Sequence, residues 1–355
     1  MTKILHTADT HIGTRQYGLE ERRADFSKAF QQIISIAIEE KVSAVIHAGD
    51  LFEDRHPSAE DLQDVFTALS RLKEAGIQFL GIVGNHEQRR NEKLQWLDLF
   101  SELGLAVHLS NEPYYLNSIP IYGLDYGGRR QLKLPHLKGG VLVAHQLIDA
   151  VNPHGELKLN ELMVCGAEVV LLGDYHEHRV WRDSARRILI TYAGSTERWS
   201  LDERSRRGCS IIDLETQRLD RRELTTRRFV YVSEDEDPLK GIDAALTSAD
   251  QKDAVVCVYL GNSQYTVKEI EEYGHSKGAL VVRVIREKTQ TEPSEGELDI
   301  SVEFGDLDVL VSERLDKMSL SETSRRIDSI VRDLERIADS AVDAEVSKIL
   351  EQSHG

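Results

Sequence analysis

Short apolar runs alternate along residues 1–235 with longer segments whose apolar positions recur at helical spacing. The short runs predict buried strands, and the longer segments predict amphipathic helices that cover them. Helices are expected over residues 19–41, from about 57 to 76, and over 92–103. This alternation predicts an α/β domain in which a sheet sandwich carries helices on its faces.

The spacing also predicts which helix positions are buried. The first helix has a stripe of Phe26, Ala29, Phe30, Ile33, Ile34 and Ala37, and the second has Leu62, Val65, Phe66, Leu69 and Leu72, with Gly76 as its stop. The third is apolar over more than one face, at Leu94, Trp96, Leu97, Leu99 and Phe100. A helix of this kind is either buried in the core or packed on a second copy of the chain as well.

The composition changes after the acidic stretch 233–238. A small α+β unit is expected next: a helix over 238–246, a strand over 254–260, a helix over 266–273 and a strand over 279–285. Thr266 and Glu269 have capping-box spacing at the start of the second of these helices, and Gly274 is its expected stop. The unit has no cluster of His or Asp that could carry out chemistry.

Residues 288–297 have the composition of a linker, and an amphipathic helix is expected from about Ser321. That helix either packs on its own chain or docks on a partner. We therefore expect four parts, namely a metallophosphoesterase nuclease domain (1–235), a capping domain (236–287), a linker (288–300) and a helical partner-docking segment (301–355).

Composition narrows the class of protein. The net charge of −17 argues against a generally basic nucleic-acid coat protein, but divalent cations and local Arg clusters can still attract DNA to one face. Cys165, Cys209 and Cys257 are far apart and have no zinc spacing, which predicts buried free thiols. No charged-then-apolar leader and no apolar run long enough for a membrane span is found, so we expect a reduced cytoplasmic enzyme.

Metal-ligand side chains follow five of the apolar runs. In chain order they are Asp9 and His11, Asp50 after Gly49, Asn85 and His86, His145, and Asp174 and His176. A two-metal phosphoesterase needs a carboxylate between its ions, with imidazoles and carboxylates completing each coordination sphere. Mixed nitrogen and oxygen ligands suit manganese, iron or zinc better than calcium. Five such motifs in succession at strand ends predict a dinuclear site.

These motifs resemble the calcineurin-like metallophosphoesterase superfamily. Within it, residues 8–13 (Ala-Asp-Thr-His-Ile-Gly), 47–52 (His-Ala-Gly-Asp-Leu-Phe) and 84–87 (Gly-Asn-His-Glu) are similar to the archaeal Mre-eleven/SbcD family of DNA double-strand-break repair nucleases. The resemblance covers about residues 1–215. It implies a four-layer α/β/β/α sandwich, a small capping domain, and a C-terminal helix that docks on a Rad-fifty-type coiled-coil ABC ATPase. It also implies a homodimer with manganese-dependent 3′–5′ double-strand exonuclease and single-strand endonuclease activity on DNA ends.

The resemblance further implies a role for each site residue. It places Asp9, His11, Asp50 and His176 around one Mn²⁺ and Asp50, Asn85, His145 and Asp174 around the other, with Asp50 as the bridge. His86 would face the scissile phosphate and protonate the leaving oxygen or stabilise its charge. The alternative is that His86 only braces the ligand loop.

Two positions depart from the family pattern. Asp174 stands where the family usually has the first His of Gly-His-x-His, and a rival register through His176 and His178 stays open. Glu53 stands where the family often has a His that it links to exonuclease chemistry. The balance of exonuclease and endonuclease activity is therefore open, with His56 as a candidate substitute.

DNA contacts are expected at the rim of the site, from Arg15, Tyr17, Arg89 and Arg90, although each of these is also an ordinary solvated loop residue. Two rival functions share the same metal scaffold. One is a phosphodiesterase or phosphatase acting on a small-molecule or protein phosphoester. The other is a DNA-end scaffold in which the altered ligands have weakened catalysis.

Overall fold

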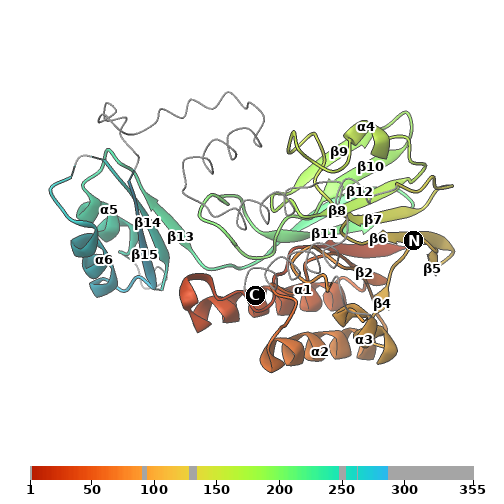
Figure 1. The fold of residues 1–355 in the computed structure, drawn as a ribbon, viewed down its shortest axis with the longest axis horizontal. Helices are drawn as coiled ribbons and strands as arrows, with labels where there is room; N and C mark the ends of the chain where they lie inside the picture. Colours follow the sequence, from red (N-terminus) through yellow and green to blue (C-terminus); the bar gives the residue numbers. More distant parts are fainter. Residues whose placement is uncertain (1, 90–93, 128–133, 248–252, 262, 287–355) are drawn as a thin grey trace, which may run out of the picture. The chain divides into compact units, whose positions relative to one another are not determined.

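The computed structural model describes residues 2–89, 94–127, 134–247, 253–261 and 263–286 (Figure 1). Two six-stranded sheets form its centre. The first, in the order β12-β11-β1-β2-β3-β4, contains β1 (Lys3–Thr7), β2 (Ala44–Ala48), β3 (Gln78–Ile82), β4 (Val107–His108), β11 (Gly208–Asp213) and β12 (Arg218–Glu223). The second, in the order β5-β6-β7-β8-β10-β9, contains β5 (Tyr114–Leu116), β6 (Ile119–Leu124), β7 (Val141–His145), β8 (Val169–Gly173), β9 (Arg179–Asp183) and β10 (Ile188–Tyr192).

The two sheets pack face to face through a buried apolar layer. Ile46 and Leu80 of the first sheet meet Val143 and Leu171 of the second in this layer. The strands that supply the layer alternate their side chains between two buried faces, which is why they appear in the sequence as continuous apolar runs. The predicted sheet sandwich is therefore confirmed.

Helices cover the outer face of the first sheet (Figure 1). They are α1 (Glu20–Glu39), α2 (Ala59–Glu74) and α3 (Trp96–Glu102), and a short 3-10 helix, η1 (Gln16–Gly18), precedes them. Ser58 begins α2 with a capping box, because its hydroxyl accepts from the Asp61 N–H while the Asp61 carboxylate accepts from the Ser58 N–H. The outer face of the second sheet is covered by the short α4 (Leu159–Leu162) and connecting segments.

Two helix predictions need correction. Phe66 was expected in the buried stripe of α2 but is 47% exposed, because Val65 and Leu69 already fill the core side of that turn. Gly274 was expected to stop its helix, yet the helix continues to Ser276. A Cβ at Gly274 would lie 2.4 Å from Val282 Cγ2, so this glycine allows close packing rather than termination. The buried stripe predicted for α1 is confirmed at every position.

A third, all-parallel sheet follows, in the order β13-β14-β15. Its elements are β13 (Phe229–Val232), α5 (Pro238–Ala245), β14 (Val255–Leu260), α6 (Val267–Ser276) and β15 (Val281–Arg286). The helices α5 and α6 cover one face of this sheet, and Thr266 and Glu269 form the predicted capping box of α6. The first strand, β13, lies before the acidic stretch and was not predicted. The linker and the partner-docking helix expected beyond residue 287 lie outside the described residues.

The other face of the third sheet packs against loops that leave the first domain. Tyr17, Leu19 and Leu201 join Phe229 and Val255 in one apolar cluster there. Ion pairs reinforce this junction, and the Asp25 carboxylate of α1 accepts hydrogen bonds from two nitrogens of Arg227. The loops that carry the predicted DNA-contact residue Tyr17 are therefore held against the third sheet.

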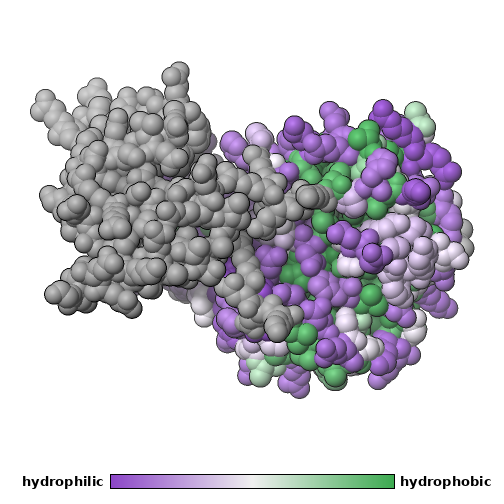
Figure 2. Space-filling view, turned by 45° about the vertical axis from the view of Figure 1, so that its right-hand side comes forward, coloured by the Kyte–Doolittle hydropathy of each residue, from purple (hydrophilic) through white to green (hydrophobic). Residues whose placement is uncertain are grey.

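All three cysteines are free and buried, as predicted. Among the described helices, none combines the length and apolar character that a bilayer crossing requires. The face drawn in Figure 2 is mostly hydrophilic where it is coloured, with small hydrophobic patches between the polar residues. A surface of this kind agrees with the strongly charged composition.

Candidate metal centre

The predicted site residues follow parallel strands whose carboxyl ends lie at one edge of the sandwich. Thr7 of β1 is level with His47 of β2, and Ala48 of β2 is level with Ile82 of β3. In the second sheet His145 of β7 is level with Gly173 of β8. Nδ1 of His145 donates to the carbonyl of Ala48 at 2.7 Å, which links the two sheets at this edge. Ligand side chains that are distant in sequence are brought together for this reason.

The backbone around these side chains is strained. Asp9, His11, Asp50 and Asp174 have left-handed φ angles of 50°, 45°, 56° and 86°, in a region that residues with a Cβ seldom occupy. Hydrogen bonds hold the strained turns, because Asp9 N donates to Gly49 O and both Thr10 N and His11 N donate to Asp50 O. Backbone strain that is concentrated at one set of polar residues is typical of a functional site.

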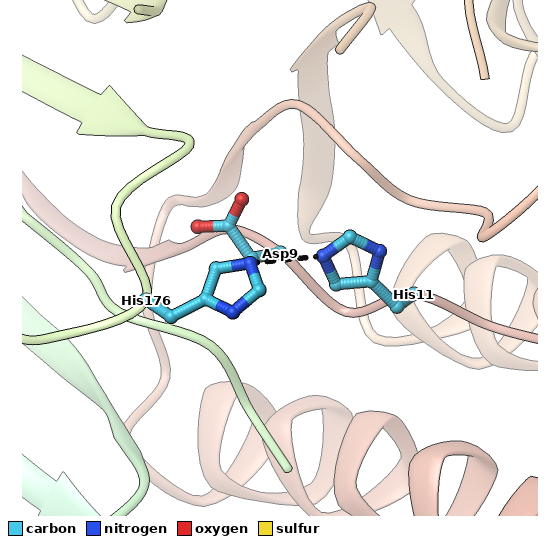
Figure 3. Close-up of side chains that lie close together, drawn as sticks. All are labelled: Asp9, His11 and His176. Carbon is cyan, nitrogen blue, oxygen red and sulfur yellow. Dashed lines mark hydrogen bonds between the residues drawn. The ribbon is translucent and has the colours of Figure 1, made fainter. Parts of the chain in front are cut away.

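One cluster joins Asp9, His11 and His176, whose candidate ligand atoms lie within 4.8 Å of one another (Figure 3). The two Nε2 atoms of the histidines face each other at 3.2 Å. Nδ1 of His176 donates to Glu203 Oε1 at 2.6 Å, and Nδ1 of His11 lies 2.9 Å from Glu53 Oε2. A metal-binding His is usually oriented by a carboxylate that accepts a hydrogen bond from the ring nitrogen not bound to the metal.

A second cluster joins Asp9, Asp50 and His145 under the same distance limit. Nε2 of His145 lies 3.2 Å from Asp50 Oδ2, 2.9 Å from Asn85 Oδ1 and 3.8 Å from Asp174 Oδ1. Asp50 Oδ2 is also 3.9 Å from His11 Nε2 of the first cluster. Asp50 therefore stands between the two clusters, where a bridging carboxylate is required.

The charge in this region favours a bound cation. Burial by itself lowers the pKa of His145, but Asp50, Asp9 and Asp174 outweigh burial and raise that pKa well above its usual range. Burial raises the pKa of Asp174 to about 6, against the opposing effect of His145. Buried carboxylates that repel one another are stabilised by a cation placed among them.

Local packing at the clusters also has two features that suit bound ions. Oδ2 of the fully buried Asp9 has no hydrogen-bond partner among the described residues, although buried carboxylate oxygens seldom lack one. A Cβ at Gly84 would lie 2.0 Å from Asp50 Oδ1, and one at Gly49 would lie 2.4 Å from His145 Nδ1. The orphaned oxygen, the two glycines and the mixed nitrogen and oxygen donors fit a dimetal site.

His86 has a different environment from the ligand candidates. Its backbone N–H donates to Asp50 Oδ1 at 3.0 Å, and its Nδ1 donates to the carbonyl of Glu53 at 3.2 Å. The side chain is 29% exposed, whereas those of His11 and His145 are fully buried. Of the imidazoles at the centre, that of His86 is the most exposed, ahead of His176 at 21%, so a substrate can reach it.

Glu53 lies at the centre of a group of side chains on the His11 side. Its Oε2 accepts from Thr14 Oγ1 at 3.0 Å and from Trp199 Nε1 at 3.1 Å, in addition to its contact with His11. It also lies 3.7 Å from His86 Nδ1, and Glu53, His11 and His86 form a third possible metal-ligand group. The sequence pattern marked Glu53 only as a departure.

Three further residues of the centre were not singled out from the sequence. The Glu87 carboxylate accepts from the backbone N–H groups of Gly84 and Phe52, so it joins two ligand loops. Glu203 orients His176, and Trp199 covers Glu53. Glu87 is the last residue of the motif 84–87 but was given no role there, whereas Glu203 and Trp199 reach the centre only through tertiary folding.

The predicted DNA-contact residues that the structure describes each have contacts within the chain. Arg15 pairs with Glu20, and Tyr17 packs on the third sheet, where burial raises its pKa to about 12. The Arg89 guanidinium lies over the Trp96 ring at 5.0 Å. Arg90 lies outside the described residues.

The two alternatives considered for altered positions also have defined locations. His178 donates from Nδ1 to the carbonyl of Tyr192 at 2.8 Å, and it belongs to no metal-ligand group among the residues that the structure describes. The backbone N–H of His56 donates to Asp54 Oδ1 in an exposed turn. Neither imidazole replaces Asp174 or Glu53 in the contacts described above.

The chain is similar to a known enzyme family and to named relatives. The family model for calcineurin-like phosphoesterases matches residues 2–180. The DNA double-strand break repair protein Mre11 of Haloferax volcanii is 38% identical over 370 residues, which cover 99% of this chain and 82% of the relative. The protein of the same name from Halobacterium salinarum is 37% identical over 364 residues, covering 96% of this chain and 92% of that protein.

Relatives of the same name occur in methanogenic archaea. The Mre11 of Methanosarcina mazei is 38% identical over 356 residues, and the match covers 93% of this chain. This chain spans only 57% of the length of that relative and 60% of the one from Methanosarcina acetivorans. The chain belongs to the calcineurin-like phosphoesterase family, in the group of archaeal Mre11 proteins.

Proposed function

We propose that the chain is a manganese-dependent nuclease that processes DNA ends in double-strand break repair. The observation that carries the proposal is the pair of ligand clusters that share Asp9, with Asp50 between His11 and His145 and the partly exposed His86 beside them. Similarity to archaeal repair proteins over nearly the whole chain supports DNA as the substrate. We propose both 3′–5′ double-strand exonuclease and single-strand endonuclease activity, in the cytoplasm.

Each side chain of the centre has a proposed role. Asp9, His11, Asp50 and His176 would hold one ion, and Asp50, Asn85, His145 and Asp174 would hold the other. When bound, the two ions activate water and neutralise charge on the scissile phosphate. Glu203 and the carbonyl of Ala48 fix the ring orientation of His176 and His145, so that the Nε2 atoms are presented inward.

His86 acts on the leaving group in this proposal. Its ring is held at Nδ1 by the Glu53 carbonyl, and its side chain is 29% exposed. A phosphodiester seated at the clusters would lie beside this ring, and His86 would donate a proton to the departing oxygen or stabilise its charge. The backbone N–H of His86 also donates to Asp50. This hydrogen bond fixes the position of the proposed acid, His86, relative to the proposed bridging ligand, Asp50.

We also propose two partners. Phe66 and Leu103 on the outer side of the helical layer are 47% and 50% exposed, which suits a homodimer contact. The second partner is a Rad-fifty-type ATPase, bound through the C-terminal helix expected beyond residue 300. That segment lies outside the described residues, so this part of the proposal rests on the sequence and the relatives.

Cleavage assays test the proposed activity. Labelled duplex and single-stranded DNA and bis-nitrophenyl phosphate would be incubated with Mn²⁺ and wild type, Asp50→Ala or His86→Ser. Cleavage of DNA by wild type alone supports the nuclease. Cleavage of only the small ester would contradict DNA as the substrate and favour the rival phosphodiesterase; no cleavage by wild type, with metal bound, would favour the DNA-end scaffold.

A further inference from the structure

Trp199 lies beside the metal centre with its indole partly exposed to solvent. It follows β10 in a segment that returns toward β11, and the residue is 38% exposed. Its ring centroid is 5.9 Å from that of His176, 6.0 Å from His86 and 6.1 Å from His11. No role for this residue follows from the ligand clusters, because an indole does not bind these metals.

The indole is held by contacts at its edge and along its backbone. Nε1 donates to Glu53 Oε2 at 3.1 Å, so the one polar atom of the ring is already used. The backbone N–H of Trp199 donates to Glu203 Oε2 at 2.9 Å, and its carbonyl accepts from Gln16 Nε2 at 2.8 Å. Both carboxylates belong to the centre, so the ring position is coupled to the ligands His11 and His176.

The exposed part of the ring is therefore carbon surface. His86 and His176 stand nearly perpendicular to the indole, at 84° and 80°, and the His11 ring is tilted from it by 38°. A tryptophan that served only to pack these imidazoles would be expected to be buried. An indole that stays exposed to water does not contribute the full free energy of burying its apolar surface. A rigid aromatic face open to solvent beside a phosphodiester site is suited to stacking.

The other described tryptophans are placed differently. Trp181 packs edge-on against Tyr192 at 6.0 Å, and the Trp96 ring lies under the Arg89 guanidinium. Tyr115 is more exposed than Trp199, at 64%, but it lies on β5 at the outer edge of the second sheet. Of these aromatic residues, Trp199 is the one that adjoins the candidate ligands.

We propose that the exposed face of Trp199 stacks on the nucleobase next to the scissile phosphodiester. This inference rests on the proposed nuclease function and makes Trp199 a specificity-determining residue of that site. Every nucleobase has a π face, so stacking selects strands that carry bases without reading their sequence. Stacking on this indole also attracts a DNA strand without relying on charge. This matters because a chain with a net charge of −17 repels the negative phosphates of DNA.

Paired substrates test the proposal. One is a labelled single-stranded oligonucleotide, and the other has the same length and backbone with abasic residues around the cleaved position. The ratio of kcat/KM for the base-bearing strand to that for the abasic strand would be measured with Mn²⁺. Trp199→Ala is expected to lower this ratio about tenfold, within the range found for removal of one stacked base. Trp199→Phe keeps a smaller aromatic face and should lower it only about twofold.

Tyr115→Ala is the matched control, because it removes an exposed aromatic side chain away from the centre; its ratio should equal that of wild type. An unchanged ratio in Trp199→Ala would overturn the proposal, and so would an equal loss on both substrates, which would assign the indole a purely structural role. Failure of wild type to cut either strand would instead contradict the nuclease function.

A binding measurement covers the case in which Trp199→Ala fails to fold. Tryptophan emission of the wild-type chain, held with Ca²⁺ in place of Mn²⁺, would be followed during titration with each oligonucleotide. Stacking predicts that the base-bearing strand quenches the emission of wild type. It also predicts no quenching by the abasic strand, and none by either strand in Trp199→Phe. Equal quenching by both strands, or quenching that persists in Trp199→Phe, would overturn the proposal.

Discussion

At the scale of single residues, His86 combines a side chain that is 29% exposed with a backbone N–H that donates to Asp50, the proposed bridging carboxylate. The backbone N–H that donates to Asp50 remains in a His86→Ser variant. We therefore expect this variant to keep its metal content and to lose cleavage by a factor of about 10² to 10⁴. Metal analysis and a DNA cleavage assay on the same preparation check this, and loss of metal from His86→Ser would assign His86 a bracing role instead.

Glu87 is a buried carboxylate that joins two loops of the centre. Burial raises its pKa to about 7, and it accepts hydrogen bonds from the N–H groups of Gly84 and Phe52. Glu87→Ala leaves both N–H groups unsatisfied, so the free energy of unfolding should fall by about 2–4 kcal/mol. Urea unfolding in chelator measures this, and the exposed Glu74→Ala should change it by less than about 0.5 kcal/mol. Equal effects of the two variants would show that the loops do not depend on Glu87.

At the scale of secondary-structure elements, an ion triad connects α3, β4 and the end of β6. His108 donates from Nδ1 to Asp98 at 2.6 Å and from Nε2 to Asp125 at 3.0 Å. Burial by itself lowers the pKa of His108, but the two carboxylates outweigh burial and raise it to about 9. Asp125 also accepts from the Val83 N–H, directly before the Gly84-Asn85 loop, so the triad supports that loop.

The raised pKa makes stability depend on pH in the alkaline range. His108 is charged in the folded chain up to about pH 9 and has an ordinary pKa of about 6.5 when unfolded. The stabilisation is complete below about pH 6.5 and is lost as the pH rises through about 9. Between pH 7 and 9.5 the unfolding free energy of wild type should therefore fall by roughly 1–2 kcal/mol more than that of His108→Gln. This figure is reduced for the screening of the partly exposed triad by solvent. An equal change of unfolding free energy with pH in wild type and His108→Gln would contradict the role of the triad.

The same scale shows what sequence patterns can predict. Buried strands and α1 were predicted well, because both faces of these strands and one stripe of α1 are apolar. The edge strands β9 and β12 were missed, since their charged residues give no apolar run. The predicted ligand residues lie at adjoining strand ends, but their left-handed backbones and the approach of Glu203 and Trp199 depend on loops folded in three dimensions.

At the scale of the whole molecule, the exposed apolar residues of the helical layer bear on assembly. Phe66 and Leu103 are exposed, and α2 and α3 lie on the same side of the first sheet (Figure 1). If the proposed homodimer uses this surface, Phe66→Asp should shift the measured mass from two chains to one in light scattering after size-exclusion chromatography. Val164→Asp, at another exposed apolar position, is the control and should leave the mass unchanged. A dimer that persists in Phe66→Asp would exclude this surface.

Metal stoichiometry tests the two-ion centre most directly, because every proposed role of the site residues depends on it. Wild type and Asp50→Ala would each be loaded with Mn²⁺, freed of unbound ions and analysed for metal per chain. Because Asp50 lies between His11 of one cluster and His145 of the other, we predict two ions per chain in wild type and loss of tight binding at both sites in Asp50→Ala. A wild-type chain with one ion or none, or an Asp50→Ala chain that keeps both, would contradict the two-metal centre.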